Sequence, residues 1–144
     1  MSIPLVEESV IKVLLIDDEP DFVKHLSQAL SRNKSFEVFG ANDGMAGFEL
    51  AVECRPDVIL LDIMMPEPDG FEVLRMLKDN SHTIGIPVVM LTAVTTHEAR
   101  LNSLKLYSEG FLEKPVTINE VVECIKSTLE RRRDIQERLD RGIL

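Results

Sequence analysis

The chain has 144 residues, which is enough for one domain and leaves no room for a second catalytic domain. Its hydrophobic content of 44%, with only 7 glycines and 7 prolines, predicts a folded core and excludes a disordered or fibrous polymer. The formal net charge of −9 disfavours direct binding to nucleic acid or to anionic lipid. No apolar run approaches the roughly 18 residues of a membrane span, and residues 1–10 lack the basic start and apolar stretch of a signal peptide. We therefore expect a cytoplasmic protein without a membrane partner.

The two cysteines, Cys54 and Cys124, are far apart in the sequence. Neither has a C-x-x-C partner or a nearby histidine, so the sequence indicates neither a disulfide framework nor a zinc site. Both are expected to be reduced thiols in or near the core.

Five short segments predict the strands of a parallel sheet. Three are continuous apolar runs, typical of strands covered on both faces: 13–16, 58–61 and 88–91. The segments 36–39 and 111–113 mix charged with apolar residues, which suits the edges of a sheet. Placing the second and fifth strands at the edges agrees with the strand order 2-1-3-4-5. The predicted fold is therefore α/β, a flavodoxin-like (βα)5 doubly wound parallel sheet.

Helices are predicted between and after these strands. The first begins at Pro20, the second at Asp43-Gly44 and the third at Asp69-Gly70, and a capping box, Thr117-x-x-Glu120, opens the fifth. A fourth helix is expected within residues 96–106, where the apolar stripe is thin. The inward-facing residues predicted from helical spacing are Phe22, Leu26, Ala29 and Leu30 in the first helix, Leu50, Ala51 and Cys54 in the second, Phe71, Leu74 and Leu77 in the third, and Ile118, Val121, Val122, Ile125 and Leu129 in the fifth.

The composition changes after Leu129. Residues 130–144 hold five arginines and four acids, while the chain before them carries a net charge of −10. We therefore expect a domain over residues 11–129 and an extended C-terminal helix or linker over 130–144. Along this helix the stripe that continues from Leu129 has two polar members, Arg132 and Gln136, before Leu139 and Ile143. The pattern fits a solvated helix, or a connecting helix that pairs with a second copy or leads to an output domain.

Polar groups follow four of the predicted strands where each strand ends. They are Asp17-Asp18-Glu19, Asp62, Thr92 and Lys114-Pro115. Singly, each group has an ordinary explanation as a helix cap, a strand end or a turn. Because the carboxyl ends of parallel strands meet at one edge of the sheet, these acids, a hydroxyl and an amine converging there indicate a site.

The charges of these residues indicate the chemistry. Clustered carboxylates raise one another's pKa unless a cation lies between them, and oxygen ligands without histidine or cysteine select a hard ion such as Mg²⁺. Lys114 adds a point charge that can contact both a carboxylate and a phosphate. Asp62 would then be placed for nucleophilic attack on a phosphoryl group, giving an aspartyl phosphate. Phosphoryl transfer depends mainly on positioning and charge neutralisation, so no general base is required.

Four segments carry a resemblance to a known family. They are Ile16-Asp17-Asp18-Glu19-Pro20, residues 61–70 (LDIMMPEPDG), Leu91-Thr92-Ala93 and residues 111–115 (FLEKP). They resemble the receiver domain of two-component response regulators over about residues 11–129. The spacings of 44 residues from Asp18 to Asp62, 30 to Thr92 and 22 to Lys114 are similar to those of the family.

The resemblance implies roles for the site residues. Asp62 would accept the phosphoryl group from a phosphohistidine on a sensor histidine kinase or phosphotransfer protein, so the chain is expected to be a phosphoacceptor and not an enzyme. Asp18, Asp62 and the backbone carbonyl of Met64 would hold Mg²⁺, with Asp17 acting mainly through water. Lys114 would hold the Asp62 carboxylate and later a phosphoryl oxygen. Pro115 resembles the family's cis-peptide position, which would aim Lys114 inward.

The resemblance also implies a switch. Thr92 matches the hydroxyl that moves to the phosphoryl group, and Phe111 the aromatic side chain that turns inward behind it. A phosphate offers Thr92 an acceptor in one state only, which biases the surface formed by the fourth helix, fifth strand and fifth helix. That surface would be the output. A homodimer could form through it or through the C-terminal helix, and the sequence leaves the oligomeric state open. His97 and Tyr107 lie near it, and residues of these types in such a place are more often ordinary surface residues than contacts.

Two departures from the family pattern stand out. Leu106-Tyr107 replaces a small Ala-Gly pair that often ends the fourth helix, which alters the output surface. Met64 and Val94, two residues beyond Asp62 and Thr92, are apolar. We hypothesise that they cannot orient an attacking water molecule, so that the phosphate is lost slowly.

Two alternatives belong to other classes. A haloacid-dehalogenase-like phosphatase also uses an aspartyl phosphate, but its nucleophile lies in a D-x-D pattern near the first strand, whereas Asp62 is followed by Met64. A receiver-like module that binds partners without phosphorylation has no support, because the acids, Thr92 and Lys114 are all present. The domain could stand alone or belong to a transcription factor, a cyclic-dinucleotide enzyme or a hybrid kinase.

Overall fold

A computed structural model describes residues 10–93, 102 and 108–143 of the chain. Its five strands form one parallel sheet in the order β2-β1-β3-β4-β5, which confirms the predicted order and its edges. The strands are β1 (Ile11–Ile16), β2 (Phe36–Ala41), β3 (Val58–Leu61), β4 (Val88–Thr92) and β5 (Gly110–Glu113). The helices described are α1 (Pro20–Ser31), α2 (Gly44–Cys54), α3 (Gly70–Lys78) and α5 (Ile118–Asp140). Of the predicted helix within 96–106, the structure describes residue 102 alone, which is helical.

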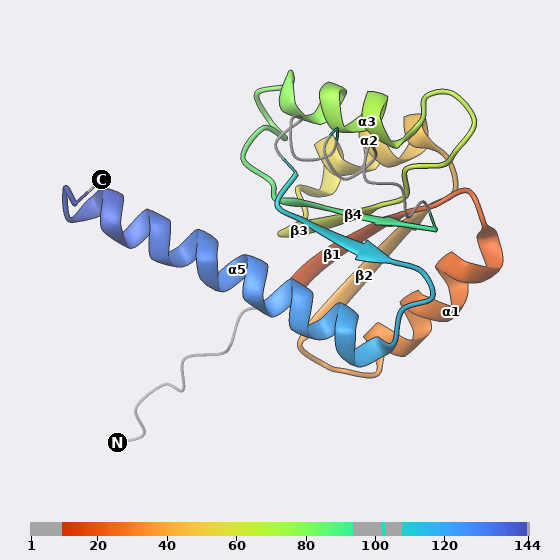
Figure 1. Cartoon of the computed structure of the whole chain (residues 1–144), viewed down its shortest axis with the longest axis horizontal. Coiled ribbons are helices and arrows are strands. Elements are labelled where there is room, and N and C mark those ends of the chain that lie inside the picture. Colours follow the sequence, from red (N-terminus) through yellow and green to blue (C-terminus); the bar gives the residue numbers. More distant parts are fainter. Residues whose placement is uncertain (1–9, 94–101, 103–107, 144) are drawn as a thin grey trace.

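Helices cover both faces of the sheet, so the core has two halves (Figure 1). One half lies between the sheet and α2 and α3, and includes Leu14, Ile59 and Met90. The other lies between the sheet and α1 and α5, and includes Val13, Leu60 and Ile125. Every residue of β3 and β4 is buried, because each of these inner strands meets a helix on both sides. The edge strands are less buried: β2 mixes buried and exposed residues, and β5 is half-buried throughout.

The predicted helix starts are confirmed. Pro20 occupies the first turn of α1, where its missing N–H would have no intrahelical partner. Asp43 accepts a hydrogen bond from the Ala46 N–H at 2.7 Å and so caps α2. Capping boxes open α3, between Asp69 and Glu72, and α5, between Thr117 and Glu120.

The predicted inward faces of the helices were only partly right. In α2 the buried residues are Gly44, Gly47 and Ala51, while Leu50 and Cys54 are half-buried. A Cβ on Gly47 would lie 2.6 Å from the Ile16 side chain, so α2 lies too close to β1 for larger residues to face it. Val23 joins Leu26 and Leu30 as the buried residues of α1, with Phe22 and Ala29 half-buried. In α3 Val73 is buried with Leu74 and Leu77, while Phe71 is half-buried.

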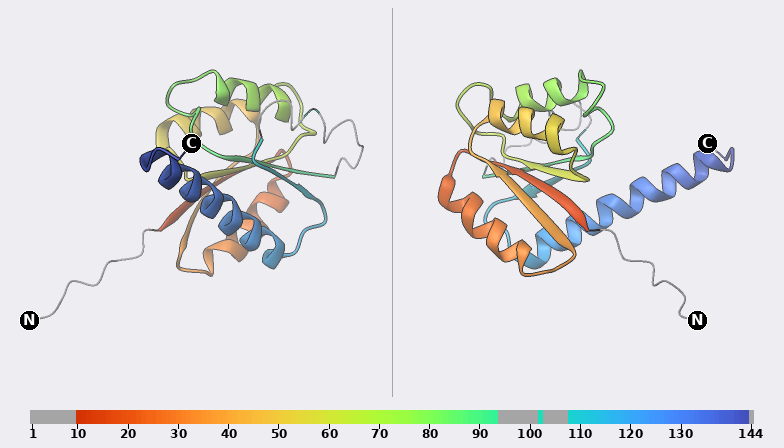
Figure 2. Two further views of the ribbon diagram at one scale, coloured as in Figure 1. Left: turned by 60° about the vertical axis from the view of Figure 1, so that its left-hand side comes forward. Right: turned by 180° about the vertical axis from the view of Figure 1, so that it is seen from behind.

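Helix α5 is 23 residues long and extends beyond the sheet, as predicted (Figure 2). Val121 and Ile125 are buried, but the prediction for Ile118 was wrong because its side chain is 37% exposed at the first turn. Every residue from 133 to 143 is exposed. The stretch before them is tied to the domain, because Arg132 donates to the Gly85 carbonyl and lies 3.5 Å from Glu109.

Both cysteines are free and half-buried, as predicted. Within residues 10–93, 102 and 108–143, no helix combines the length and the apolarity needed to cross a membrane.

Candidate functional site

Backbone hydrogen bonds at the carboxyl end of the sheet bring the predicted polar residues together. The Asp17 N–H donates to the Ala41 carbonyl at 3.1 Å, and the Asp62 N–H donates to the Ile16 carbonyl at 2.9 Å. The Lys114 N–H donates to the Thr92 carbonyl at 2.8 Å. Each of these bonds continues the pairing of two strands by one residue, so the sheet itself fixes where the side chains begin.

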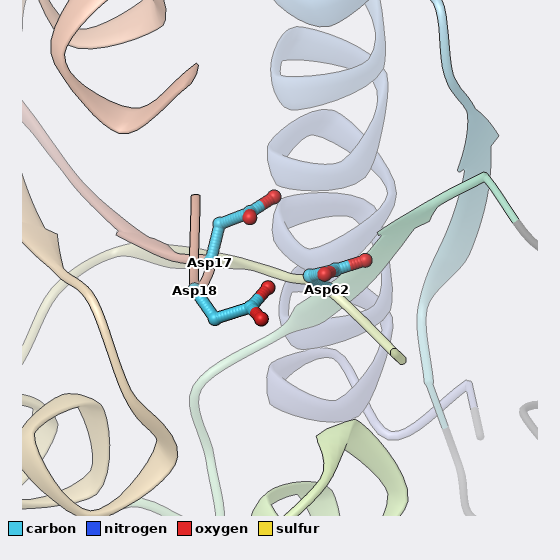
Figure 3. Close-up of side chains that lie close together, drawn as sticks. All are labelled: Asp17, Asp18 and Asp62. Atoms are coloured by element: carbon cyan, nitrogen blue, oxygen red, sulfur yellow. The ribbon is translucent and has the colours of Figure 1, made fainter. Parts of the chain in front are cut away.

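Three carboxylates form a cluster at this edge. One oxygen each from Asp17, Asp18 and Asp62 lies within 4.8 Å of the other two, and the side chains come from the ends of β1 and β3 (Figure 3). Asp17 and Asp62 are buried, while Asp18 is half-buried and keeps the cluster open to solvent. Oxygen donors at this separation can hold a hard divalent cation, so the residues present fit a metal site of the magnesium type.

The Asp62 carboxyl group is electrostatically unusual. Burial and the neighbouring charge of Asp17 raise its pKa to about 6, against the opposing effects of Lys114 and of a hydrogen bond from the Thr92 side chain. Ionising a buried acid costs free energy, and a cation placed beside the acid lowers that cost because it stabilises the carboxylate. The cluster therefore attracts positive charge to the position where Asp62 could act.

Lys114 reaches this cluster from the end of β5. Its ammonium nitrogen lies 2.6 Å from Oδ2 of Asp17 and 3.4 Å from Oε1 of Glu19. Burial lowers the pKa of Lys114, but its hydrogen bond to Asp17 and the charges of the surrounding acids outweigh burial, and the pKa is raised. The ammonium therefore stays protonated. The Lys114–Pro115 peptide bond is cis, as the resemblance implied.

The predicted contact between Lys114 and the Asp62 carboxylate takes a different form here. Of the residues that the structure describes, Asp17 and Glu19 lie within ion-pair distance of Lys114. Asp62 lies beyond that distance, but the charge of Lys114 still lowers the pKa of its carboxyl group. Thr92 is buried and bonded to Asp62, and Phe111 is half-buried against the core half under α2 and α3.

The loop after Asp62 is anchored to the start of α3. The Gly70 N–H donates to the Ile63 carbonyl at 2.9 Å, and a Cβ on Gly70 would overlap the Asp62 carbonyl oxygen. Met64, whose carbonyl was predicted as a metal ligand, exposes 65% of its side chain at the rim. The Glu67–Pro68 bond in this loop is also cis, which the sequence analysis did not predict.

Two residues near the site were missed by the sequence analysis as functional candidates. From the sequence, Glu19 is only part of an acidic run and Phe22 only a core residue, yet both contact the Lys114 ammonium, which lies 4.1 Å from the Phe22 ring centroid. Their position could have indicated this role, because both residues follow β1 directly, in the loop and first helical turn next to the site.

Four residues singled out in the sequence analysis lie outside the described residues: Val94, His97, Leu106 and Tyr107.

Comparisons with known proteins agree with this fold and site. The family model for the response regulator receiver domain matches residues 13–126. The receiver domain of the Francisella response regulator 1452 superposes with a TM-score of 0.76 at 30% identity, covering 84% of this chain and 98% of that one. The chemotaxis protein CheY4 of Vibrio cholerae superposes with a TM-score of 0.78 at 29% identity, covering 84% and 100% of the two chains. The chain belongs to the response regulator receiver domain family.

The chain spans about half the length of the transcriptional regulators it matches. The probable transcriptional regulatory protein TcrX of Mycobacterium tuberculosis is 36% identical over 121 residues, which are 84% of this chain and 50% of that protein. The probable transcriptional regulatory protein SilR of Salmonella typhimurium is 33% identical over 120 residues, which are 83% and 51% of the two. Receiver domains are generally non-enzymatic signalling domains of two-component systems, and they partner with histidine kinases.

Proposed function

We propose that this chain receives a phosphoryl group on Asp62 from a phosphohistidine donor. The observation that carries the proposal is the joint placement of Asp17, Asp18 and Asp62 within 4.8 Å, with the Lys114 ammonium 2.6 Å from Asp17. Such a site attracts positive charge to one buried nucleophile. Membership of the receiver family supports the same function.

The transfer is a single displacement at phosphorus. An oxygen of Asp62 forms a P–O bond while the P–N bond to the donor imidazole breaks, and the imidazole nitrogen keeps the electron pair and later takes a proton. Lys114 would leave Asp17 to contact a phosphoryl oxygen. The chain assists its own phosphorylation in this way without turning over a substrate.

A divalent cation of the magnesium type completes the proposed site. Asp18, Asp62 and the backbone carbonyl of Met64 would hold it directly, and Asp17 through water. When bound, Mg²⁺ supplies charge neutralisation for the phosphoryl oxygens. The donor set supports this assignment, since carboxylates without histidine or cysteine favour a hard ion.

Phosphorylation would be read out by Thr92 and Phe111. The Thr92 hydroxyl, which bonds to Asp62 in the free chain, would turn to a phosphoryl oxygen, and Phe111 would move inward behind it. This differential contact biases the surface that includes β5 and α5, together with the region between β4 and β5.

The proposed partners are a sensor histidine kinase or phosphotransfer protein in the cytoplasm, and a second copy of the chain. The copy would pair through the β5 and α5 surface or through the end of α5, where Ile135, Leu139 and Ile143 are 51%, 51% and 61% exposed. The net charge of −9 argues against direct contact of this domain with nucleic acid.

Intact-mass spectrometry tests the function. After incubation with acetyl phosphate and Mg²⁺, we expect one phosphoryl adduct on the wild-type chain and none on the Asp62→Asn variant. Omitting Mg²⁺ should prevent the adduct on the wild type. A folded wild-type chain without an adduct, or an equal adduct on Asp62→Asn, would contradict the proposal.

A further inference from the structure

The Lys114 ammonium is held on three sides in the free chain. It bonds to Asp17 at 2.6 Å, lies 3.4 Å from Glu19, and lies over the face of the Phe22 ring, 4.1 Å from its centroid. The Lys114 side chain is only 12% exposed, so little water competes for these contacts. All three partners come from the end of β1 and the first turns of α1.

These contacts also fix Asp17. Its Oδ1 accepts a hydrogen bond from the Glu19 N–H at 2.9 Å, and its Oδ2 accepts from Lys114. Both oxygens of this fully buried carboxylate are thus engaged in one arrangement. The ammonium thus contacts residues at the end of β1 and the start of α1, and the Asp62 carboxylate is not among the described ion-pair partners of Lys114.

We propose that Phe22 is a positioning residue whose ring, together with Glu19, holds the Lys114 ammonium on Asp17 until a phosphoryl group arrives at Asp62. This inference rests on the proposed function, in which Lys114 moves to a phosphoryl oxygen. The contact with Phe22 exists only before that movement, so it stabilises the unphosphorylated form. A ligand-linked equilibrium shifts by the difference in such contacts between its two states.

Removing the ring should therefore favour the phosphoryl-bound form. Phe22→Leu keeps an apolar side chain and leaves every charge around the metal site in place, which Glu19→Gln would not. From the strength of a cation–π contact, we expect the loss to shift the equilibrium about two- to fivefold toward the state in which Lys114 contacts phosphoryl oxygens.

The test measures equilibrium binding of beryllium fluoride, a non-covalent mimic of the phosphoryl group, at saturating Mg²⁺. Phe22→Leu should bind about two- to fivefold more tightly than the wild type, and Phe22→Tyr, which keeps the ring face, should restore wild-type affinity. Phe48→Leu is the matched control, since Phe48 is a half-buried ring on α2 at the opposite face of the sheet. It should leave the affinity unchanged.

A double variant shows whether the effect passes through Lys114. In a Lys114→Met background, Phe22→Leu should have no effect on affinity. In the free wild-type chain, nuclear Overhauser contacts should join the Lys114 ε-protons to the Phe22 ring. Thermal unfolding of each variant without ligand identifies any that fail to fold. If Phe22→Leu fails to fold, Phe22→Tyr still tests whether the ring face determines the affinity.

Three results would overturn the proposal: equal affinities for wild type and a folded Phe22→Leu, an unchanged Phe22→Leu effect in the Lys114→Met background, or absence of the Overhauser contacts. A wild-type chain that takes up neither the mimic nor a covalent phosphoryl group contradicts the proposed function as well. A wild type that takes up both, with no effect of Phe22, contradicts the positioning role alone.

Discussion

At the scale of single residues, the burial of Asp62 that suits its proposed role as nucleophile also lowers the stability of the fold when the carboxyl group ionises. Its carboxyl group is 3% exposed and has a pKa of about 6, above the ordinary value of 3.8. An acid whose pKa is raised by folding contributes no cost below the unfolded pKa and destabilises the fold as the pH rises through the window from 3.8 to about 6. The free chain at neutral pH therefore carries an ionised, buried acid.

Asp62→Asn should stabilise the metal-free chain. We expect its free energy of unfolding to exceed that of the wild type by roughly 1–3 kcal/mol at pH 7.5, because the amide need not ionise. The difference should shrink toward zero near pH 4, where Asp62 is protonated in the folded chain. Urea unfolding at both pH values with a chelator measures this, and Asp79→Asn, at an exposed acid, serves as control. An equal gain at pH 4 and pH 7.5 would show that ionisation is not the cause.

Met64 provides a test of phosphate lifetime. Met64 is 65% exposed, and its thioether is only a weak hydrogen-bond acceptor and a poor group to orient an attacking water molecule. Under the proposed function, Met64→Asn should shorten the half-life of the phosphorylated chain severalfold at neutral pH with Mg²⁺. The decay of the adduct mass with time measures it, with Met45→Asn, an exposed methionine on α2, as control. Loss of phosphate from the wild type within seconds would contradict the hypothesis of slow hydrolysis.

At the scale of secondary-structure elements, the start of α3 is built against the phosphoacceptor loop. A Cβ on Gly70 would lie 2.6 Å from the Ile63 Cα and would overlap the Asp62 carbonyl oxygen, so the backbone itself would have to move. Gly70→Ala should therefore lower the free energy of unfolding by about 1–3 kcal/mol and slow the phosphorylation of Asp62. Chemical unfolding and adduct formation with acetyl phosphate measure the two effects.

The control for Gly70→Ala is Gly85→Ala. A Cβ on Gly85 meets nothing within 4 Å, and its φ lies outside the left-handed region, so stability should change by less than about 0.5 kcal/mol. Equal effects of the two substitutions would mean that loss of glycine as such, and not contact with the Asp62 loop, is responsible.

The elements also show how far the sequence alone could predict this fold. The strands, their order and the helix caps were predictable because burial on both faces and capping hydrogen bonds leave local patterns. The inner face of α2 was not, because the close approach of Gly47 to Ile16 depends on how the helix packs on the sheet. Helical spacing favoured the larger Leu50 and Cys54, and spacing alone does not report the distance between layers.

The site, too, has features that the sequence could predict and features that it could not. Asp17, Asp62, Thr92 and Lys114 were predictable because strand ends converge by topology. The place of the Lys114 ammonium was not, since it depends on the direction of a long side chain across the site to Phe22. Glu19 is likewise 67% exposed and joins the site only through Lys114.

At the scale of the whole molecule, the second half of α5 leaves the domain, and the described residues after Arg132 are all exposed. Arg132 lies 3.5 Å from Glu109, which also lies 3.9 Å from Lys78, and Arg131 donates to the Glu109 carbonyl at 3.3 Å. These contacts lie beyond residue 129, the predicted domain boundary, and beyond Arg132 the described residues are exposed. Helix α5 therefore contacts the rest of the domain as far as Arg132, and the family match, which ends at residue 126, does not include this part.

Truncation separates the two parts of the helix. A chain ending at Arg133 should unfold at the same temperature as the whole chain, because an isolated helical end adds little stability in water. A chain ending at Leu129 should lose the contacts of Arg131 and Arg132 and unfold roughly 3–5 °C lower. Arg132→Ala in the whole chain should reproduce part of that loss, and Arg133→Ala should not. If the chain ending at Arg133 already unfolds at a lower temperature, and if the melting temperature of the whole chain rises with its concentration, residues 134–144 stabilise the fold by pairing two copies instead.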